Sequence, residues 1–287
     1  MRDFSHGTNH LSINTATLRK QLDLPGIIEA SARHGIGTIC PWRDQVRAAG
    51  IERVAAQLRD AGVSLSGYCR GGFYTAADAA GLSAALDDNR RAIDEATALG
   101  APCLVLVVGS LPGALTGPPL THDIALARAQ VFDGIAASLD YARQANMPLA
   151  IEPLHPMQAA ERACVNTLEQ ALDICDALDP TRSGALGVAL DVYHVWWDPK
   201  LESQIARAGR ERLLAYHICD WLVPTRDLLN DRGMMGDGVI ELKKVRGWVE
   251  AAGYTGAAEV EIFSERWWDT PAQEVLSTCI ARYNSVV

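Results

Sequence analysis

Four side chains of types that bind metal ions end four short apolar runs in the second half of the chain. They are Glu152, Asp191, His217 and Glu261. Each run has the length of a buried strand and stops on a carboxylate or an imidazole, as a parallel strand does when its C-terminal tip lies in an active site. Two Glu, one Asp and one His form an oxygen-rich set suited to one divalent ion. We expect Mn²⁺ first, with Mg²⁺, Co²⁺ or Zn²⁺ as alternatives.

Two histidines follow these run ends and could serve a substrate. His194 stands three residues after Asp191, and on a turn this spacing can present both side chains to one ion or one substrate. His155 follows Glu152 after Pro153, which ends the strand. Each histidine could transfer a proton or contact a substrate hydroxyl. The alternatives are ordinary loop histidines, and an Asp191 that only caps the next helix.

Two further acidic residues stand close to the candidate ligands. Asp220 comes three residues after His217 and could orient it, contact substrate or lie in a plain loop. Glu259 precedes Glu261 by two residues, so both side chains face the same side of a strand. Glu261 is nearer the C-terminal end and is the better expected ligand. Glu259 either joins it or makes a structural ion pair one layer deeper.

Aromatic and basic residues gather in the segments expected at the same end of the strands. Six of the seven tryptophans follow predicted strand ends: Trp42, Trp196, Trp197, Trp221, Trp267 and Trp268. They predict an aromatic wall around a ligand, with Trp42 and Trp196 as substrate contacts, or a subunit interface in a homo-oligomer. Alternatively, the tryptophans only pack over the C-terminal ends of the strands. Five loop arginines could hold an anion, although nothing in the sequence orders them: Arg43, Arg70, Arg226, Arg232 and Arg266.

Eight apolar runs alternate with longer segments of helical periodicity. The runs are residues 10–14, 36–40, 63–68, 103–108, 148–152, 186–191, 213–218 and 257–262. The clearest helical pattern covers residues 82–99 and is followed by Gly100, a typical C-cap. This alternation predicts an α/β fold, a (β/α)8 TIM barrel, whose catalytic groups lie at the C-terminal ends of the strands. No linker or composition shift divides the chain, so residues 1–287 are expected to form one domain.

Charge and cysteine content narrow the expected partners. The formal net charge is −9 and only four lysines occur, which argues against nucleic acid as a partner. Seven scattered cysteines without CxxC pairs indicate a reducing compartment. No apolar run has membrane-spanning length, and the first residues lack the apolar core of a signal peptide. We therefore expect a cytoplasmic protein with no membrane partner.

In this order the motifs resemble those of the sugar phosphate isomerase/epimerase superfamily, also called xylose isomerase-like TIM barrels. The similarity covers nearly the whole chain and is strongest from Glu152 to Trp268. It is carried by the segments IEPL, LDVYH, HICD, GDGVI and VEIF at residues 151–154, 190–194, 217–220, 236–240 and 260–263. The resemblance implies that the four residues that end the apolar runs bind the metal. It also implies that Glu152 and Glu261 act as acid and base, and that His194 and Arg232 contact substrate.

The same superfamily contains ketose 3-epimerases, hydroxypyruvate isomerase, inosose isomerase and several dehydratases. This chain resembles the endonuclease IV-type repair enzymes of the superfamily least. Where they carry additional metal-binding histidines, this chain reads CPW, YCR and DGV at residues 40–42, 68–70 and 237–239. The motifs therefore identify the superfamily but do not identify the substrate.

The leading hypothesis is a metal-dependent isomerase or epimerase acting on a small polyhydroxy carbonyl compound. One carboxylate would remove the α-proton, the ion would stabilise the enediolate, and a second carboxylate would return the proton. The alternative is a lyase, in which the same enediolate expels a β-substituent as in inosose or dehydroshikimate dehydratases. A third hypothesis is a sugar-binding barrel that holds no metal and performs no reaction.

Overall fold

Parallel strands form the centre of this computed structural model, which describes residues 7–112 and 117–287. Within these residues, hydrogen bonds join the strands in the order β3-β2-β1-β11-β8-β7-β6-β5-β4. Their bounds are β1 (Leu11–Asn14), β2 (Thr38–Cys40), β3 (Ser64–Leu65), β4 (Tyr68–Gly72), β5 (Leu104–Val107), β6 (Leu149–Glu152), β7 (Leu186–Asp191), β8 (Leu213–Ile218) and β11 (Ala258–Val260). Each of the eight expected apolar runs contributes a strand to this sheet, so the predicted TIM barrel is confirmed.

The barrel is nearly closed where β3 and β4 meet β2. The third expected strand is broken: β3 pairs with β2, whereas β4 pairs with β5 and extends to Gly72, beyond the predicted end at residue 68. A parallel bridge between Trp42 and Cys69 continues the contact toward β2. Gly72 has φ 106°, and a Cβ there would lie 1.8 Å from the carbonyl oxygen of Val107. The close approach of β4 to β5 therefore requires glycine.

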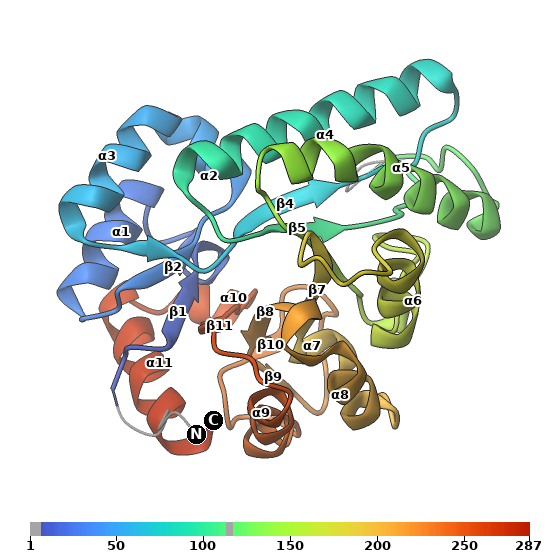
Figure 1. The fold of residues 1–287 in the computed structure, drawn as a ribbon. Coiled ribbons are helices and arrows are strands. Elements are labelled where there is room, and N and C mark those ends of the chain that lie inside the picture. The colour runs from blue at the N-terminus through green and yellow to red at the C-terminus, as the bar shows by residue number, and fades with distance from the viewer. Residues whose placement is uncertain (1–6, 113–116) are drawn as a thin grey trace.

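Helices surround the strands (Figure 1). The longer ones are α1 (Leu24–Arg33), α2 (Arg43–Ala49), α3 (Ile51–Ala61), α4 (Ala79–Leu99), α5 (Ile124–Gln144), α6 (Leu168–Leu178), α8 (Leu201–Arg212), α9 (Leu242–Ala251) and α11 (Ala272–Val286). Asp78 caps the start of α4 by accepting from the Gly81 N–H, and Asp123 caps α5 in the same way. Gly62 and Gly100 take the left-handed conformation that ends α3 and α4.

Short elements follow the C-terminal ends of the strands and build the mouth of the barrel. They are η1 (Thr15–Leu18), η2 (Pro156–Gln158), α7 (Val192–Val195), β9 (Asp220–Trp221), β10 (Arg232–Gly233) and α10 (Glu265–Trp268). Strands β9 and β10 form a separate antiparallel pair. The N–H of Arg232 donates to the carbonyl of Phe263 at 2.9 Å, which ties β10 to the segment after β11. This contact holds Arg232 over the strand ends.

Strand register brings the expected ligands to one side of the mouth. Asp191 on β7 is the register partner of His217 on β8, and His217 is the partner of Glu259 on β11. Glu261 follows Glu259 by two residues and so extends toward the mouth on the same face. Small buried side chains form a separate apolar cluster: Cys40, Cys69, Cys103, Val105, Ala150, Ala189 and Ala215. Within the described residues, no helix has the length and apolar character needed to cross a membrane.

Candidate metal centre and active site

Four buried side chains meet at the C-terminal ends of β6, β7, β8 and β11. Glu152, Asp191, His217 and Glu261 each offer one ligand atom, and these atoms lie within 4.8 Å of one another. The four strands are neighbours in the sheet, so residues far apart in sequence converge without any long loop. The structure thus brings together all four residues that the sequence singles out as candidate ligands.

The imidazole of His217 lies between two layers of carboxylates. Its Nδ1 lies 3.0 Å from Glu152 Oε1 and 3.8 Å from Glu261 Oε2. Its Nε2 faces Glu259 Oε1 at 3.4 Å but makes no hydrogen bond. Burial disfavours the imidazolium, yet Glu259, Glu152 and Glu261 together raise the pKa of His217 well above its usual value. Nδ1 therefore faces the ligand cluster, and Nε2 faces the deeper carboxylate.

Arg232 is the cation within this carboxylate cluster. Its Nη1 donates to Asp191 Oδ2 at 2.8 Å and to Glu261 Oε2 at 3.0 Å. Burial opposes the charged form of Asp191, but Arg232 and two histidines lower the pKa of this carboxyl below its usual value. For Glu261 burial dominates, and it raises the pKa to about 8 despite Arg232. Adjacent carboxylates thus differ strongly in their tendency to hold a proton.

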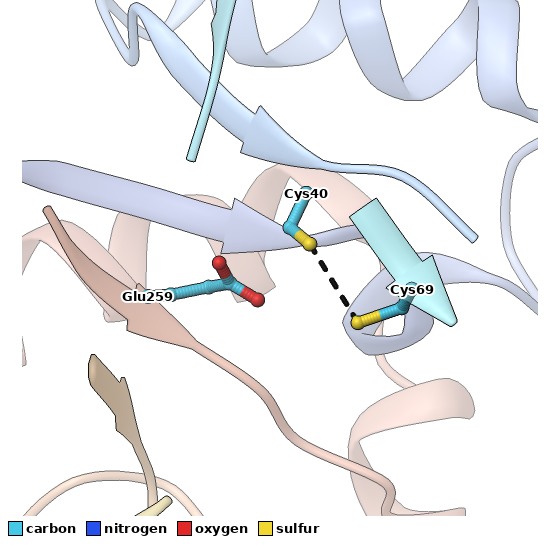
Figure 2. Close-up of side chains that lie close together, drawn as sticks. All are labelled: Cys40, Cys69 and Glu259. Carbon is cyan, nitrogen blue, oxygen red and sulfur yellow. Dashed lines mark hydrogen bonds between the residues drawn. The ribbon is translucent and has the colours of Figure 1, made fainter. Parts of the chain in front are cut away.

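A second cluster lies deeper in the barrel and contains Cys40, Cys69 and Glu259 (Figure 2). The two sulfur atoms lie 3.7 Å apart. Both oxygens of Glu259 already accept hydrogen bonds, from Asn14 Nδ2 and from Ser66 Oγ, each at 2.7 Å. Burial raises the pKa of the Cys40 thiol well above its usual value, so the thiolate form that binds metal is disfavoured. Glu259 is therefore a structural carboxylate that faces His217 from below.

The charges of the upper cluster suit a divalent cation. When all three are ionised, Glu152, Asp191 and Glu261 contribute three negative charges, and Arg232 contributes one positive charge. The raised pKa values of His217 and Glu261 mean that protons balance this charge when no ion is bound. Once both groups release their protons, the buried cluster has an excess of two negative charges, which a divalent cation would neutralise. A neutral His217 with its proton on Nε2, toward Glu259, leaves the Nδ1 lone pair free for an ion. The residues present therefore fit one divalent metal.

A cavity of about 470 Å³ opens beside the cluster. Glu152, Glu261, His194 and Arg232 form its polar floor. Aromatic side chains form part of its wall, among them Trp42, Phe263 and Trp268. The Trp42 and Phe263 rings meet edge to face at a centroid distance of 5.5 Å. The expectation that Trp42 faces a ligand pocket agrees with this placement.

The two histidines near the mouth have different surroundings. His194 is buried, and desolvation lowers the pKa of its imidazole to about 3, so the ring is neutral. Its Nδ1 accepts from the backbone N–H of His155 at 3.1 Å, and its Nε2 lies 3.2 Å from Arg232 Nη2, which can only donate. Nε2 lies 3.6 Å from Asp191 Oδ2 on the cavity side. The His155 ring instead stacks on Trp221 at 4.6 Å and does not line the cavity.

Asp220 does not join the site, in contrast to the expected contact with His217 or substrate. Its Oδ2 accepts from the N–H groups of Gly236 and Gly238, both at 2.9 Å. Its Oδ1 accepts from the N–H groups of Trp221 and Ile240. All four donors are backbone groups of the surrounding loop, so this carboxylate organises the chain around β9 and has a structural role.

Trp196 also differs from the expected substrate contact. It lines a separate hollow beside Trp197 and Trp248, between the ends of α8 and α9. Its ring packs against Trp221 at a centroid distance of 5.7 Å. The loop after β7 turns as helix α7, and this turn carries Trp196 away from the cavity while His194 stays inside it.

Other cavity residues were not expected from the sequence. Gln158 and Arg162 reach the cavity from the segment after β6, and Lys20 and Arg19 reach it from the segment after β1. Asn14 supports it from below, because it donates to Glu259 and accepts from Trp42 Nε1 at 2.7 Å. The only available signal was position, since all of these residues follow or end a predicted strand.

Comparison with known proteins agrees with this architecture. The Xylose isomerase-like TIM barrel family matches residues 28–281. An inosose isomerase from Halalkalibacterium halodurans is 23% identical over 208 residues, or 72% of this chain and 69% of that protein. The crystal structure of protein SMc04130 from Sinorhizobium meliloti 1021 is 57% identical, with a TM-score of 0.92 over 98% of this chain and 99% of that one.

Two more distant structures share the fold. An IolI protein with a bound zinc atom has a TM-score of 0.79 at 19% identity, covering 96% of this chain and 99% of that one. D-psicose 3-epimerase, solved with D-fructose, has a TM-score of 0.73 at 18% identity, covering 96% and 100%. The family match spans most of the chain, and this protein therefore belongs to the xylose isomerase-like TIM barrel family.

Proposed function

We propose that this protein is a divalent-metal-dependent isomerase or epimerase of a small polyhydroxy carbonyl compound. One observation carries the proposal: the carboxylates of Glu152 and Glu261 both line the cavity and also belong to the buried ligand cluster. Two carboxylates at one reacting centre can remove a proton and return one. Membership of a family that contains isomerases and epimerases agrees with this chemistry.

In this proposal the two glutamates exchange the substrate's α-proton. Glu152 ends β6 and Glu261 follows β11, and strands β7 and β8 lie between them in the sheet. A substrate in the cavity would therefore meet one carboxylate from each side. One takes the proton from the carbon next to the carbonyl. The other gives a proton back to the opposite face of that carbon, which is epimerisation, or to the former carbonyl carbon, which is isomerisation.

Glu152, Asp191, His217 and Glu261 would hold the ion. When bound, a divalent cation supplies Lewis-acid stabilisation of the negative charge that develops on the substrate oxygens. His194 would bind the same region of the substrate, because it lines the cavity and its imidazole stays neutral. Arg232 supplies a fixed positive charge beside Asp191 and Glu261 and orients their carboxylates.

Turnover in D₂O tests this proposal. The protein, reconstituted with Mn²⁺, is incubated with a panel of ketoses and keto-cyclitols, and products are followed by NMR. We expect an isomer or epimer that carries deuterium at the carbon next to the carbonyl, because a carboxylate exchanges its proton with solvent. Conversion without solvent deuterium would indicate hydride transfer and reject the two-carboxylate mechanism. Release of water with formation of an unsaturated product would identify a lyase instead.

A further inference from the structure

Five cationic side chains line the cavity, and three of them have acidic partners. Arg19 pairs with Asp44, and Lys20 pairs with Glu265 at 3.0 Å. Arg232 pairs with Asp191 and Glu261, as described above. The remaining two, Arg70 and Arg162, have no ion-pair partner among residues 7–112 and 117–287. The unpaired cations thus share one cavity with the candidate metal centre.

Arg70 is held rigidly but its charge is not balanced. Its guanidinium lies over the Phe73 ring at 4.2 Å and near the Trp42 ring at 5.5 Å. Its Nη1 is buried and makes no hydrogen bond. Burial is the main cause that lowers the pKa of Arg70 to about 10, which reports an environment poor in compensating negative charge. Aromatic packing therefore fixes the direction of a donor group that lacks an acceptor.

Arg162 adds a second cation to the same part of the cavity. It follows η2 in the segment after β6 and is partly exposed. It lies close enough to Arg70 for the two like charges to disfavour each other. Among the cavity carboxylates, Glu152 acts on the charge of Arg70, but the two side chains form no ion pair. Glu152 belongs instead to the ligand cluster. Two unpaired guanidinium groups beside one cavity are a favourable place for an anion.

We propose that Arg70 and Arg162 form a subsite for an anionic substituent of the substrate, a carboxylate or a phosphate. This inference rests on the proposed function, since it names the class of substrate: an acidic or phosphorylated polyhydroxy carbonyl compound. Arg70 Nη1 and Arg162 bind the anion, and the carbon chain extends toward Glu152 and Glu261. The cavity volume of about 470 Å³ suits a small molecule of this kind.

Binding of carbonyl-free probes tests the subsite without any need for turnover. The probes are methyl α-D-glucopyranoside, its 6-phosphate and the corresponding methyl glucuronide, titrated calorimetrically into the Mn²⁺-loaded protein. We expect the charged probes to bind about 10- to 100-fold more tightly than the neutral one, as two charge-assisted contacts allow. Comparison of the phosphate with the glucuronide decides which anion the subsite prefers.

Three variants of the subsite and one control variant test which residues cause this preference. Arg70→Gln and Arg162→Gln should each remove most of the preference for the charged probes, and Arg70→Lys should retain part of it. Arg33→Gln, an exposed change on α1 away from the cavity, should leave the preference intact. Because Arg162 is partly exposed, its variant is expected to fold even where Arg70→Gln does not.

Equal binding of neutral and charged probes, or a full preference in both Arg→Gln variants, would overturn the subsite. Deuterium exchange on a neutral ketose alone would likewise overturn it and leave the proposed function standing. An arginine-dependent preference for charged probes without any deuterium exchange across the panel would support the subsite and reject the proposed reaction. The two proposals can therefore fail separately.

Discussion

Two arginines lie buried at opposite ends of this barrel, and their surroundings differ in charge. Arg212 is 0% exposed and ends α8 directly before β8, on the side of the strand N-termini. Arg232 is 4% exposed on β10, above the strand C-termini. Burying a guanidinium is costly unless carboxylates and carbonyls satisfy it. The two ends of the barrel meet this requirement differently.

At the lower end, positive and negative charges are matched. Arg212 donates to Asp179 Oδ2 at 3.0 Å and to the carbonyl of Leu186 at 2.7 Å. Asp176 lies 3.3 Å away and also pairs with Arg207, while Asp179 also meets Arg143. Each of these two carboxylates therefore contacts two arginines. Arg212 lines none of the described pockets. This arrangement joins α6 to the base of β7 and β8 and is structural.

At the upper end, three carboxylates and a single arginine share one cluster. Arg232 contacts Asp191 and Glu261, while Glu152 adds a third carboxylate beside His217. A cavity opens next to these groups. The comparison agrees with a division in which the base of the barrel supplies stability and its mouth holds the proposed reaction. The predictions below separate the two ends, from the largest expected effect to the smallest.

Removing either proposed base should have the largest effect on turnover. Glu152→Gln and Glu261→Gln keep the side-chain shape but cannot carry a proton, so the rate should fall roughly 10²- to 10⁴-fold. Steady-state kinetics measure the loss, and metal content is measured on the same samples because an amide is the poorer ligand. Glu241→Gln on the exposed start of α9 is the matched control and should keep full activity. Activity close to wild type in both cavity variants would remove the glutamates from the mechanism.

Removing the partner of Arg212 should affect stability instead. Asp179→Ala leaves a buried guanidinium without its main carboxylate, and the free energy of unfolding should fall by about 3–5 kcal/mol. Urea denaturation measures this change. Turnover per folded molecule should remain near wild type, because the cavity lies at the other end of the barrel. A loss below about 1 kcal/mol, the range of an exposed pair, would show that the base does not carry the expected stability.

A smaller effect is expected at the carboxylate below the metal centre. Glu259→Gln removes the charge that faces His217 Nε2 while keeping hydrogen-bonding groups near Asn14 and Ser66. Metal affinity should weaken by about 10- to 100-fold, as for other groups that orient a ligating histidine. Competition with a chromogenic chelator measures the affinity. An unchanged affinity would mean that Glu259 does not orient the imidazole.

Much of this organisation could be predicted from the sequence because strand tips are local features. Apolar runs that stop on Glu152, Asp191 and His217 specify strand ends, and parallel register then brings those ends together. The continuation of the third strand to Gly72 was missed, because it depends on Gly72 fitting against β5, a contact with a different segment. Helix caps such as Asp78 and Gly100 are again local, and Gly100 was predicted.

The roles of loop residues were harder to predict, because they depend on tertiary partners. Asp220 accepts hydrogen bonds from backbone N–H groups up to 20 residues later in the chain, and no local sequence pattern predicts these contacts. Arg43 and Arg70 look alike in sequence, yet Arg43 is paired with Asp88 and Glu95 on α4, whereas Arg70 has no acidic partner among the described residues. Only the folded arrangement identifies which arginine is left for a ligand.

Metal content tests the central claim most directly, that the mouth of the barrel holds one divalent ion. The protein is stripped with a chelator, reconstituted with Mn²⁺, desalted and analysed by mass spectrometry of the elements. Wild type and the lower-end variant Asp179→Ala, where it folds, should retain about one equivalent per chain, and His217→Ala and Asp191→Ala should lose most of it. Full metal retention by both His217→Ala and Asp191→Ala would contradict the assignment.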